Sequence, residues 1–328
     1  MKNGLFISLC LLFIVGCNKS EDSPLIPDKV NATILVQLAT NYVQLPEKEI
    51  AHSLNYNTYA QYAMPTDKYE HGILGDKIEA EQLVVVVDSI FCEHKLSGDY
   101  VFEDIRPRLY DLDGDSTLEF ITIRTNVHNG AGITIYKIVE EQLVEYAYLP
   151  EIGTSSRWLN VVTINDLDND GVVELVWIET PHIGGILKVA KIEAGVLQVL
   201  SERAQYSNHA VGERNLCLSV LSQQLNAKVF YVPNQSRDTI QGFTFSNNEL
   251  IDYEAIPHEV DFSKTLASQY NFSNILEDED HCIAVKEQPY HRALVSFLDS
   301  LIAVSNRGTV ALLRHEPMLS FARISDSI

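Results

Sequence analysis

Short runs in which apolar and polar residues alternate, or in which apolar residues are continuous, dominate the middle of the chain. EFITIRT (119–125) and ELVWIET (174–180) are rich in Ile, Val, Thr and aromatic residues, and each is followed by a similar run, GITIYKI (132–138) or ILKVAKI (186–192). A period of two residues with Gly and polar turns between the runs is typical of β-strands, and no helical period is present here. The pattern predicts several short strands in each unit.

Two independent markers indicate that these strands form a repeated unit. Acidic stretches begin at Asp111 and again at Asp166. Hairpins place a leucine at the start of a strand at Leu143, Leu197 and Leu250, which recur with nearly the same spacing as the acidic stretches. Four-stranded repeats of this length are typical of propeller blades, whereas a β-sandwich, the alternative fold, requires no regular period. We therefore expect an all-β fold, a β-propeller-like array of four-stranded blades of about 53–55 residues each.

The repeat weakens toward both ends of residues 29–257, which we assign to one repeat domain. The third unit has Val220, Ser222 and Gln224 where the aspartates of the earlier units stand, so its loop has lost the carboxylates. Upstream, a strand and a hairpin occur without an acidic loop. Roughly four units are visible, which is few for a propeller. We therefore expect residues 29–64, in which 32–45 would supply strands, or else the C-terminal segment to complete a further blade.

Beyond residue 257 the period is lost. Ala293, Phe297 and Leu301 follow the i, i+4, i+8 spacing of one helix face. The pattern predicts an extension at 258–328 that is partly helical, with a short amphipathic helix that packs on the repeat domain.

Each acidic stretch places carboxylates at positions 1, 3, 5 and 9 of a loop. They are Asp111, Asp113, Asp115 and Glu119 in the first loop, and Asp166, Asp168, Asp170 and Glu174 in the second. Ca²⁺ takes about six to eight oxygen ligands, to which the position 7 carbonyls of Thr117 and Val172 can contribute. Two carboxylates about 4 Å apart repel by roughly 4 kcal/mol at an effective dielectric of 20, so the arrangement favours a bound cation. The alternative is a pair of solvated acidic β-turns.

The spacing excludes an EF-hand, which needs Glu at position 12 and flanking helices. DLDNDGVVELVWIETPHIGGILKVAKIE (166–193) resembles the FG-GAP/VCBS repeat, the calcium-loop blade of integrin-α-type propellers and of many exported bacterial proteins. Three further segments resemble parts of small bacterial VCBS-repeat proteins, namely 62–76, 157–159 and 208–213. The resemblance covers about residues 59–257 and implies calcium held by the eight carboxylates. Ser116 replaces the usual Gly at position 6, so the first loop fits the family pattern less well.

The N-terminus predicts export and lipid anchoring in a bacterial cell envelope. Residues 1–16 contain an apolar stretch too short to span a bilayer, which takes about 20 residues, and match a signal peptide. Ile14-Val15-Gly16-Cys17 resembles a lipobox, so Cys17 is expected to carry the lipid, with residues 17–28 as a flexible tether. A plain secretory signal is the alternative. Asn18 after the cysteine favours the outer membrane.

Charge narrows the possible partners. The chain has 24 Lys and Arg against 45 Asp and Glu, a formal net charge of −21. Such a chain repels nucleic acid and anionic lipid headgroups, because phosphate binding needs Lys and Arg. We therefore expect no nucleic acid partner and contact with the membrane only through the lipid anchor.

Signatures of catalysis are absent from the sequence: it has no GxSxG, HExxH, Walker-type loop or GxGxxG. His128 and His182 recur with the repeat, which favours a structural role. We expect a non-catalytic, calcium-binding module that presents loops to a protein or glycan partner. The alternatives are an envelope hydrolase or lyase with its site in the propeller channel, or a scaffold subunit. An enzyme should bring His, Asp or Glu side chains from different units together.

Overall fold

The computed structural model describes residues 32–53, 55–216 and 218–257. The signal peptide, the tether, Cys17 and the extension at 258–328 lie outside the described residues. Within them, no helix is long and apolar enough to cross a bilayer. The described chain is all-β apart from one helix, as the alternating pattern predicted.

The strands form four consecutive antiparallel meanders. The first contains β1 (Ala51–Ser53), β2 (Thr58–Thr66), β3 (Glu79–Val87) and β4 (Ile90–Lys95). The second contains β5 (Tyr100–Phe102), β6 (Arg108–Tyr110), β7 (Glu119–Asn126), β8 (Gly130–Val139) and β9 (Gln142–Leu149), with β5 and β6 both pairing with β7. The third contains β10 (Leu159–Asn165), β11 (Glu174–Glu179), β12 (Ile186–Glu193) and β13 (Val196–Ala204). The fourth contains β14 (Val220–Gln223), β15 (Lys228–Pro233), β16 (Thr239–Ser246) and β17 (Glu249–Pro257).

Only narrow contacts join the first three meanders into one continuous sheet of 13 strands. One antiparallel pair, Ala80 with Phe102, connects the first meander to the second. One parallel pair, Val196 with Tyr148, connects the third to the second. The fourth meander is a separate sheet of four strands. The meander is therefore the natural unit of this fold.

The same hairpin closes every meander. Its two-residue turn joins the last two strands, and both residues have positive φ, as a type I′ turn requires. The turns are Asp88-Ser89, Glu140-Glu141, Ala194-Gly195 and Asn247-Asn248. A shift in strand register, or β-bulge, follows the same period in the last three hairpins, at Ile135/Tyr136, Val189/Ala190 and Gly242/Phe243. The three leucine-marked hairpins therefore share one turn type and one register shift.

Hydrophobic clusters fill the space between neighbouring meanders. One cluster lies between the first and second meanders, one between the second and third, and one between the third and fourth. Trp177 on β11 and Phe230 on β15 are fully buried members. Both faces of the inner strands are covered, which explains why ELVWIE at β11 is a continuous apolar run rather than an alternating one.

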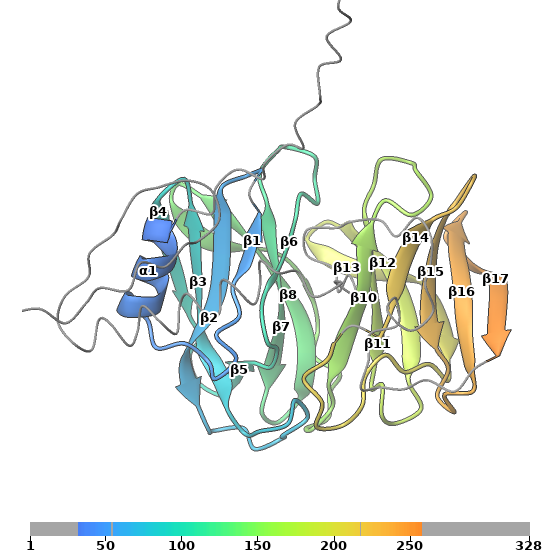
Figure 1. The fold of residues 1–328 in the computed structure, drawn as a ribbon, viewed down its shortest axis with the longest axis horizontal. Coiled ribbons are helices and arrows are strands. Elements are labelled where there is room, and N and C mark those ends of the chain that lie inside the picture. The colour runs from blue at the N-terminus through green and yellow to red at the C-terminus, as the bar shows by residue number, and fades with distance from the viewer. Residues whose placement is uncertain (1–31, 54, 217, 258–328) are drawn as a thin grey trace, which may run out of the picture.

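The expectation that residues 32–45 form strands is wrong. Residues Ala32–Asn41 form the helix α1, whose buried Ile34, Leu35 and Leu38 pack on the outer face of the first meander. The meanders follow one another in an open row, with α1 and β17 at opposite ends of the longest axis (Figure 1). The helix thus covers one end of the row of sheets.

Candidate functional site

Each acidic loop connects two paired antiparallel strands of one meander. The first loop joins β6 to β7 and the second joins β10 to β11. Glu119 and Glu174 are the first residues of β7 and β11, and both side chains are fully buried. The fold therefore anchors each loop by its position 9 glutamate, while most of the loop projects to the surface.

Position 1 of each loop fixes the turn of the backbone. Asp111 accepts hydrogen bonds from the Gly114 N–H at 2.8 Å and from the Ser116 N–H at 3.1 Å, one on each carboxylate oxygen. Asp166 likewise accepts from the N–H groups of Asp170 and Gly171, at 3.0 and 3.1 Å. These are Asx-type contacts, which hold a loop in place with or without a metal ion.

Position 9 closes each loop from the other side. Glu119 Oε2 accepts from the Leu112 N–H at 2.7 Å, and Glu174 Oε2 accepts from the Leu167 N–H at 2.6 Å. The position 7 residues also act through their N–H groups. Those of Thr117 and Val172 donate to Asp115 and Asp170, each at 2.8 Å. The predicted role of the Thr117 and Val172 carbonyl oxygens stays a prediction.

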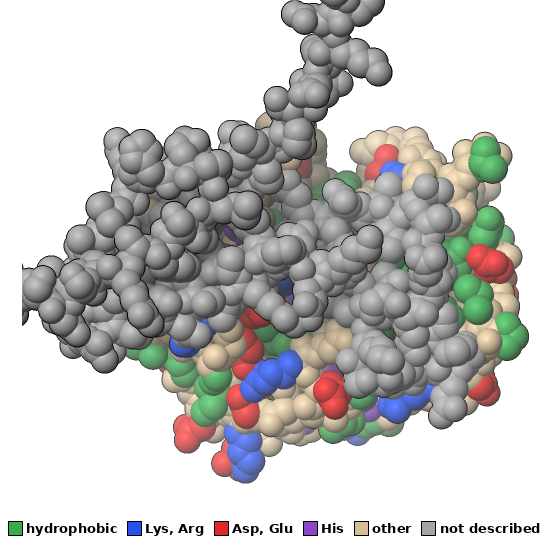
Figure 2. All heavy atoms as spheres, in the orientation of Figure 1, with side chains coloured by type: hydrophobic (Ala, Val, Ile, Leu, Met, Phe, Trp, Pro, Cys, Tyr) green, Lys and Arg blue, Asp and Glu red, His purple; other side chains and the backbone are tan. Residues whose placement is uncertain are grey.

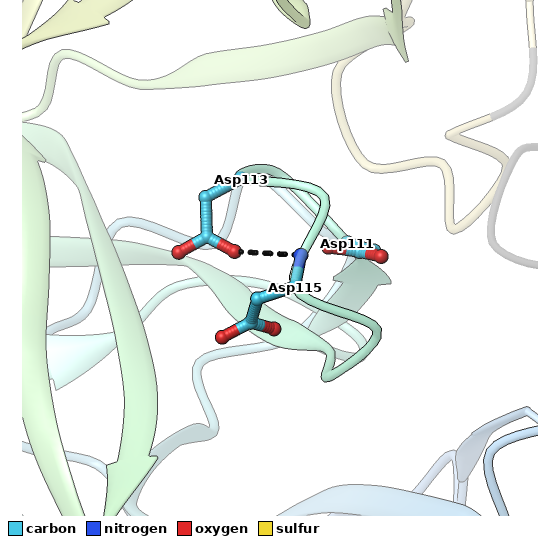
Figure 3. A group of neighbouring side chains, drawn as sticks. All are labelled: Asp111, Asp113 and Asp115. Carbon is cyan, nitrogen blue, oxygen red and sulfur yellow. Dashed lines mark hydrogen bonds between the residues drawn. The ribbon is translucent and has the colours of Figure 1, made fainter.

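The carboxylates that converge differ between the loops. In the first loop, Asp111, Asp113 and Asp115 bring one oxygen each within 4.8 Å of the others, and Figure 3 shows them around the turn. In the second loop, the convergent set is Asp166, Asp168 and Glu174. Glu119 and Asp170 are thus predicted ligands that stand outside the convergent sets.

A lysine reaches into each loop from the strand that follows the one beginning with the position 9 glutamate. Lys137 on β8 places its ammonium 2.7 Å from Asp113, 2.6 Å from Asp115 and 3.3 Å from Glu119. Sequence reasoning missed this residue, because it lies well beyond the end of the loop at Glu119, on the next strand of the chain.

Lys191 on β12 repeats the arrangement. Its ammonium lies 2.7 Å from Asp170, 2.9 Å from Glu174 and 3.8 Å from Asp168. It follows Lys137 by one length of the repeat, so alignment of the repeats could have identified the pair.

The lysine only partly compensates the carboxylates of the first loop. Burial raises the pKa of Glu119 to about 7, although the Leu112 N–H and Lys137 both act to lower it. Hydrogen bonds from Lys137 and Thr117 hold the pKa of the exposed Asp115 at about 2. Burial would lower the pKa of Lys137, but the carboxylates outweigh it and raise that pKa. Lys137 therefore does not fully offset the cost of burying the Glu119 carboxylate.

Three buried carboxylate oxygens in the loops make no hydrogen bond within the described residues. They are Glu119 Oε1, Glu174 Oε1 and Asp168 Oδ1. The lysines approach the two glutamate oxygens at ion-pair distance but without hydrogen-bond geometry. A buried carboxylate oxygen without a donor is costly, and a cation ligated at that point would remove the cost.

The fourth meander, which is the third unit of the sequence repeat, lacks the carboxylates of the two acidic loops, as its sequence predicted. Ser222 is fully buried and accepts from Gln224 Nε2 at 2.9 Å. Lys228 starts β15 where Glu119 and Glu174 start their strands, and its ammonium donates to the backbone carbonyl of Asp166. A lysine therefore stands where the earlier units have the anchoring glutamate.

A second polar cluster lies mainly in connections between strands. His71 Nδ1 is 2.6 Å from Glu103 Oε1, and this fully buried carboxylate also accepts from the Thr125 hydroxyl at 2.7 Å. Trp158 Nε1 donates to the Glu103 carbonyl at 2.9 Å. Burial raises the pKa of Glu103, while His71 and Thr125 lower it.

His182 and His209 continue this cluster through Trp158. His209 Nε2 is 2.7 Å from the Glu213 carbonyl, which can only accept, so this nitrogen carries the proton. His209 Nδ1 therefore accepts from His182 Nε2 at 3.0 Å. Burial lowers the pKa of both histidines to about 4, so both rings are neutral at pH 7. His128, at the equivalent phase of the repeat, is instead 72% exposed.

The surface charge is mixed where the described residues form the surface. Acidic and basic side chains lie interspersed there, as Figure 2 shows for one face. Lys137 and Lys191 offset part of the acidic charge of the loops, although the whole chain is strongly acidic.

Comparisons with known proteins leave the family open. No family model and no curated protein matches the chain. A rhamnogalacturonan lyase from Bacillus licheniformis is similar with a TM-score of 0.34 and 13% identity, over 54% of this chain and 42% of that one. A candidate 6-phosphogluconolactonase from Bacteroides fragilis is similar with a TM-score of 0.32 and 13% identity, over 61% of this chain and 55% of that one. The chain spans about half the length of these structures, and such scores carry no functional argument.

Proposed function

We propose that this protein is a calcium-binding, β-propeller-like binding module of the bacterial cell envelope, held by a lipid on Cys17. Support for the architecture comes from four successive antiparallel meanders of four or five strands with a hydrophobic cluster between each neighbouring pair, the packing that propeller blades use. In this proposal each meander is one blade, and the open row is part of a ring. The two acidic loops belong to its second and third blades.

One observation supports calcium above the others. Two loops in consecutive repeats have the same backbone frame, and each contains a buried glutamate whose Oε1 makes no well-oriented hydrogen bond within the described residues and is approached by a lysine ammonium at ion-pair distance. Oxygen-only ligand sets of this kind suit a hard cation such as Ca²⁺. The residues that would hold it are Asp111, Asp113, Asp115 and Glu119, and Asp166, Asp168, Asp170 and Glu174. Bound calcium would supply a fixed positive charge that stiffens the loop, without taking part in a reaction.

Metal analysis of the purified protein tests the calcium proposal. Protein dialysed against calcium and then against metal-free buffer should retain about two calcium ions per chain by mass spectrometry. A variant with Glu119→Gln and Glu174→Gln should retain fewer ions and serves as the matched control. Wild-type protein that retains no divalent ion under any calcium concentration would refute the proposal.

The anchoring part of the proposal has a separate test. Cys17→Ser, expressed behind an unrelated cleavable secretory signal in place of residues 1–16, should move the mature protein from the membrane fraction into the soluble envelope fraction, because the lipid would be the only membrane attachment. Affinity capture on envelope proteins and on immobilised glycans would then identify the partner class. A Cys17→Ser protein that still sediments with membranes would contradict the lipid anchor.

The alternative of an envelope hydrolase or lyase gains support from the histidine cluster. His71 and Glu103 come from connections around the first and second meanders, whereas His182 and His209 come from the third meander and its exit. A buried carboxylate that holds an imidazole is a common arrangement for general-base catalysis. Activity on envelope polysaccharides that disappears in His71→Gln but survives in His128→Gln would favour this alternative. Equal activity of both variants would count against it.

A further inference from the structure

The two lysines occupy the same oxygens that the calcium proposal assigns to the ion. Lys137 contacts Asp113, Asp115 and Glu119, which are three of the four carboxylates of the first loop. Lys191 contacts the three corresponding residues of the second loop. Two loops with the same arrangement, supplied by the same strand of the repeat, make an accidental contact a poor explanation.

Ammonium and calcium exclude each other from such a site. Ca²⁺ binds carboxylate oxygens at about 2.3–2.6 Å. Lys137 Nζ already lies 2.6 to 3.3 Å from the carboxylate oxygens of the first loop. A dication on those oxygens would stand within a few ångströms of the ammonium, and the two positive charges repel. One of them must leave when the other binds.

An aromatic ring already lies beside each ammonium in the loop, and it would stay within reach of the ammonium once the carboxylates release it. Lys137 Nζ lies 5.5 Å from the centroid of the Tyr146 ring on β9, within range of a cation–π contact. Lys191 Nζ lies 6.0 Å from the Phe245 ring, which belongs to β16 of the next meander. The four-carbon stem of lysine allows such a move with little change of the backbone.

We propose that Lys137 and Lys191 are tethered counter-ions that fill the two loops in the absence of calcium and leave them when calcium binds. Each loop is then a site with two alternative cations, and this inference rests on the calcium proposal. The tethered ammonium keeps the loop folded without metal and weakens its affinity for calcium. At the second loop, the exchange also changes a contact between the third and fourth meanders.

Lysine-to-methionine variants test the exchange, because methionine keeps much of the stem and removes the charge. In the presence of chelator, Lys137→Met and Lys191→Met should each lower Tm by about 2–4 °C, because the loop carboxylates lose their counter-ion. Titration with calcium by isothermal calorimetry should show affinity raised about tenfold at the loop concerned.

Lys188→Met is the matched control. Lys188 lies on β12 beside Lys191, is as exposed as Lys137 at 17%, and pairs with Glu179 outside the loops. This variant should leave calcium affinity unchanged, whatever its effect on Tm.

The outcomes separate the two proposals. Calcium binding by wild-type protein with the same affinity in all three variants overturns the exchange and leaves the calcium proposal standing. Wild-type and variant proteins that bind no calcium overturn the calcium proposal and the exchange together. Higher affinity in Lys137→Met and Lys191→Met but not in Lys188→Met supports both.

Discussion

The two acidic loops reach the same backbone geometry with different residues. Both have positive φ at positions 4 and 6: Gly114 and Ser116 in the first loop, Asn169 and Gly171 in the second. Glycine thus stands at position 4 in one loop and at position 6 in the other. The left-handed conformation is therefore required at both positions. Glycine at either position is enough when a small polar residue occupies the other.

The two acidic loops differ in how far their residues are buried. The convergent carboxylates of the first loop are exposed or partly exposed, whereas those of the second include the fully buried Glu174. Leu167, the residue that Glu174 holds, is also buried, but its counterpart Leu112 is only half-buried. The second loop is therefore the more strongly integrated into the core, and variants can test that difference.

Removal of the anchoring glutamate should give the largest effect. Glu174→Ala should lower the free energy of unfolding by about 3 kcal/mol and Glu119→Ala by about 2 kcal/mol. The cost is larger in the second loop because the Leu167 N–H is left without an acceptor in a buried position. Urea unfolding followed by fluorescence measures both values, with Glu179→Ala as a control on β11. Equal losses in the two loops would remove the proposed difference in depth.

Acidification should destabilise the protein through His182 and His209, which lie outside the acidic loops. His182 and His209 have a pKa of about 4, below the usual value of 6.5, so the unfolded chain binds more protons between these pH values. Their contribution is complete above pH 6.5 and decreases as pH falls toward 4. We expect a loss of about 2 kcal/mol, allowing for solvent near half-buried His182.

The matching control for this pH effect removes the titrating rings. In His182→Gln with His209→Gln, the part of the pH dependence between pH 6.5 and 4 that belongs to the pair should vanish. The buried loop glutamates act in the opposite sense, because burial raises the pKa of Glu119 to about 7 and also raises that of Glu174, so the folded protein binds more protons than the unfolded chain there. The double variant removes the histidine part alone. An unchanged pH profile in the double variant would show that the loops or other carboxyls control acid stability.

Sequence patterns predicted the local parts of this structure. Alternating and continuous apolar runs located the strands, and the leucine markers located hairpins that share one turn type. The helix α1 was missed because its apolar residues were assigned to strands. Ile34, Leu35 and Leu38 in fact line one helix face, whose burial depends on contact with the first meander. Short apolar runs do not distinguish the two cases by themselves.

The site was predictable only where its contacts are local. The hydrogen bonds of Asp111 and Asp166 stay within their own loops, and the loop pattern contains all of their partners. Lys137 and Lys191 come from a strand one hairpin later. The contact between His182 and His209 joins two separate connections and depends on how these connections meet. Long-range charge pairs of this kind follow from topology, which alternating patterns do not determine.

Calcium removal should reveal a smaller difference in stability between the two loops than removal of an anchoring glutamate does. Calcium at about 100 times its Kd adds about 2.7 kcal/mol to stability for each occupied loop, and chelation removes this gain. Asp168→Ala should abolish about 1–2 kcal/mol of the gain and Asp113→Ala less, because Asp168 belongs to the set that includes buried Glu174. Melting curves with calcium and with chelator give the difference for each variant. Identical curves under the two conditions in wild-type protein would argue against calcium in either loop.

Exchange of Ser116 and Gly171, which occupy the sixth position of their loops, should give the smallest effect and the most direct comparison. Ser116 has φ of 68° and Gly171 has φ of 87°. A Cβ atom added at Gly171 would meet no atom within 4 Å, so only the backbone conformation opposes a side chain there. Ser116→Gly should therefore stabilise the protein by about 1 kcal/mol, and Gly171→Ser should destabilise it by a similar amount. The double variant should restore wild-type stability in chelator, because the sites are independent. A destabilising Ser116→Gly would mean that the serine side chain contributes to the first loop more than its backbone strain costs.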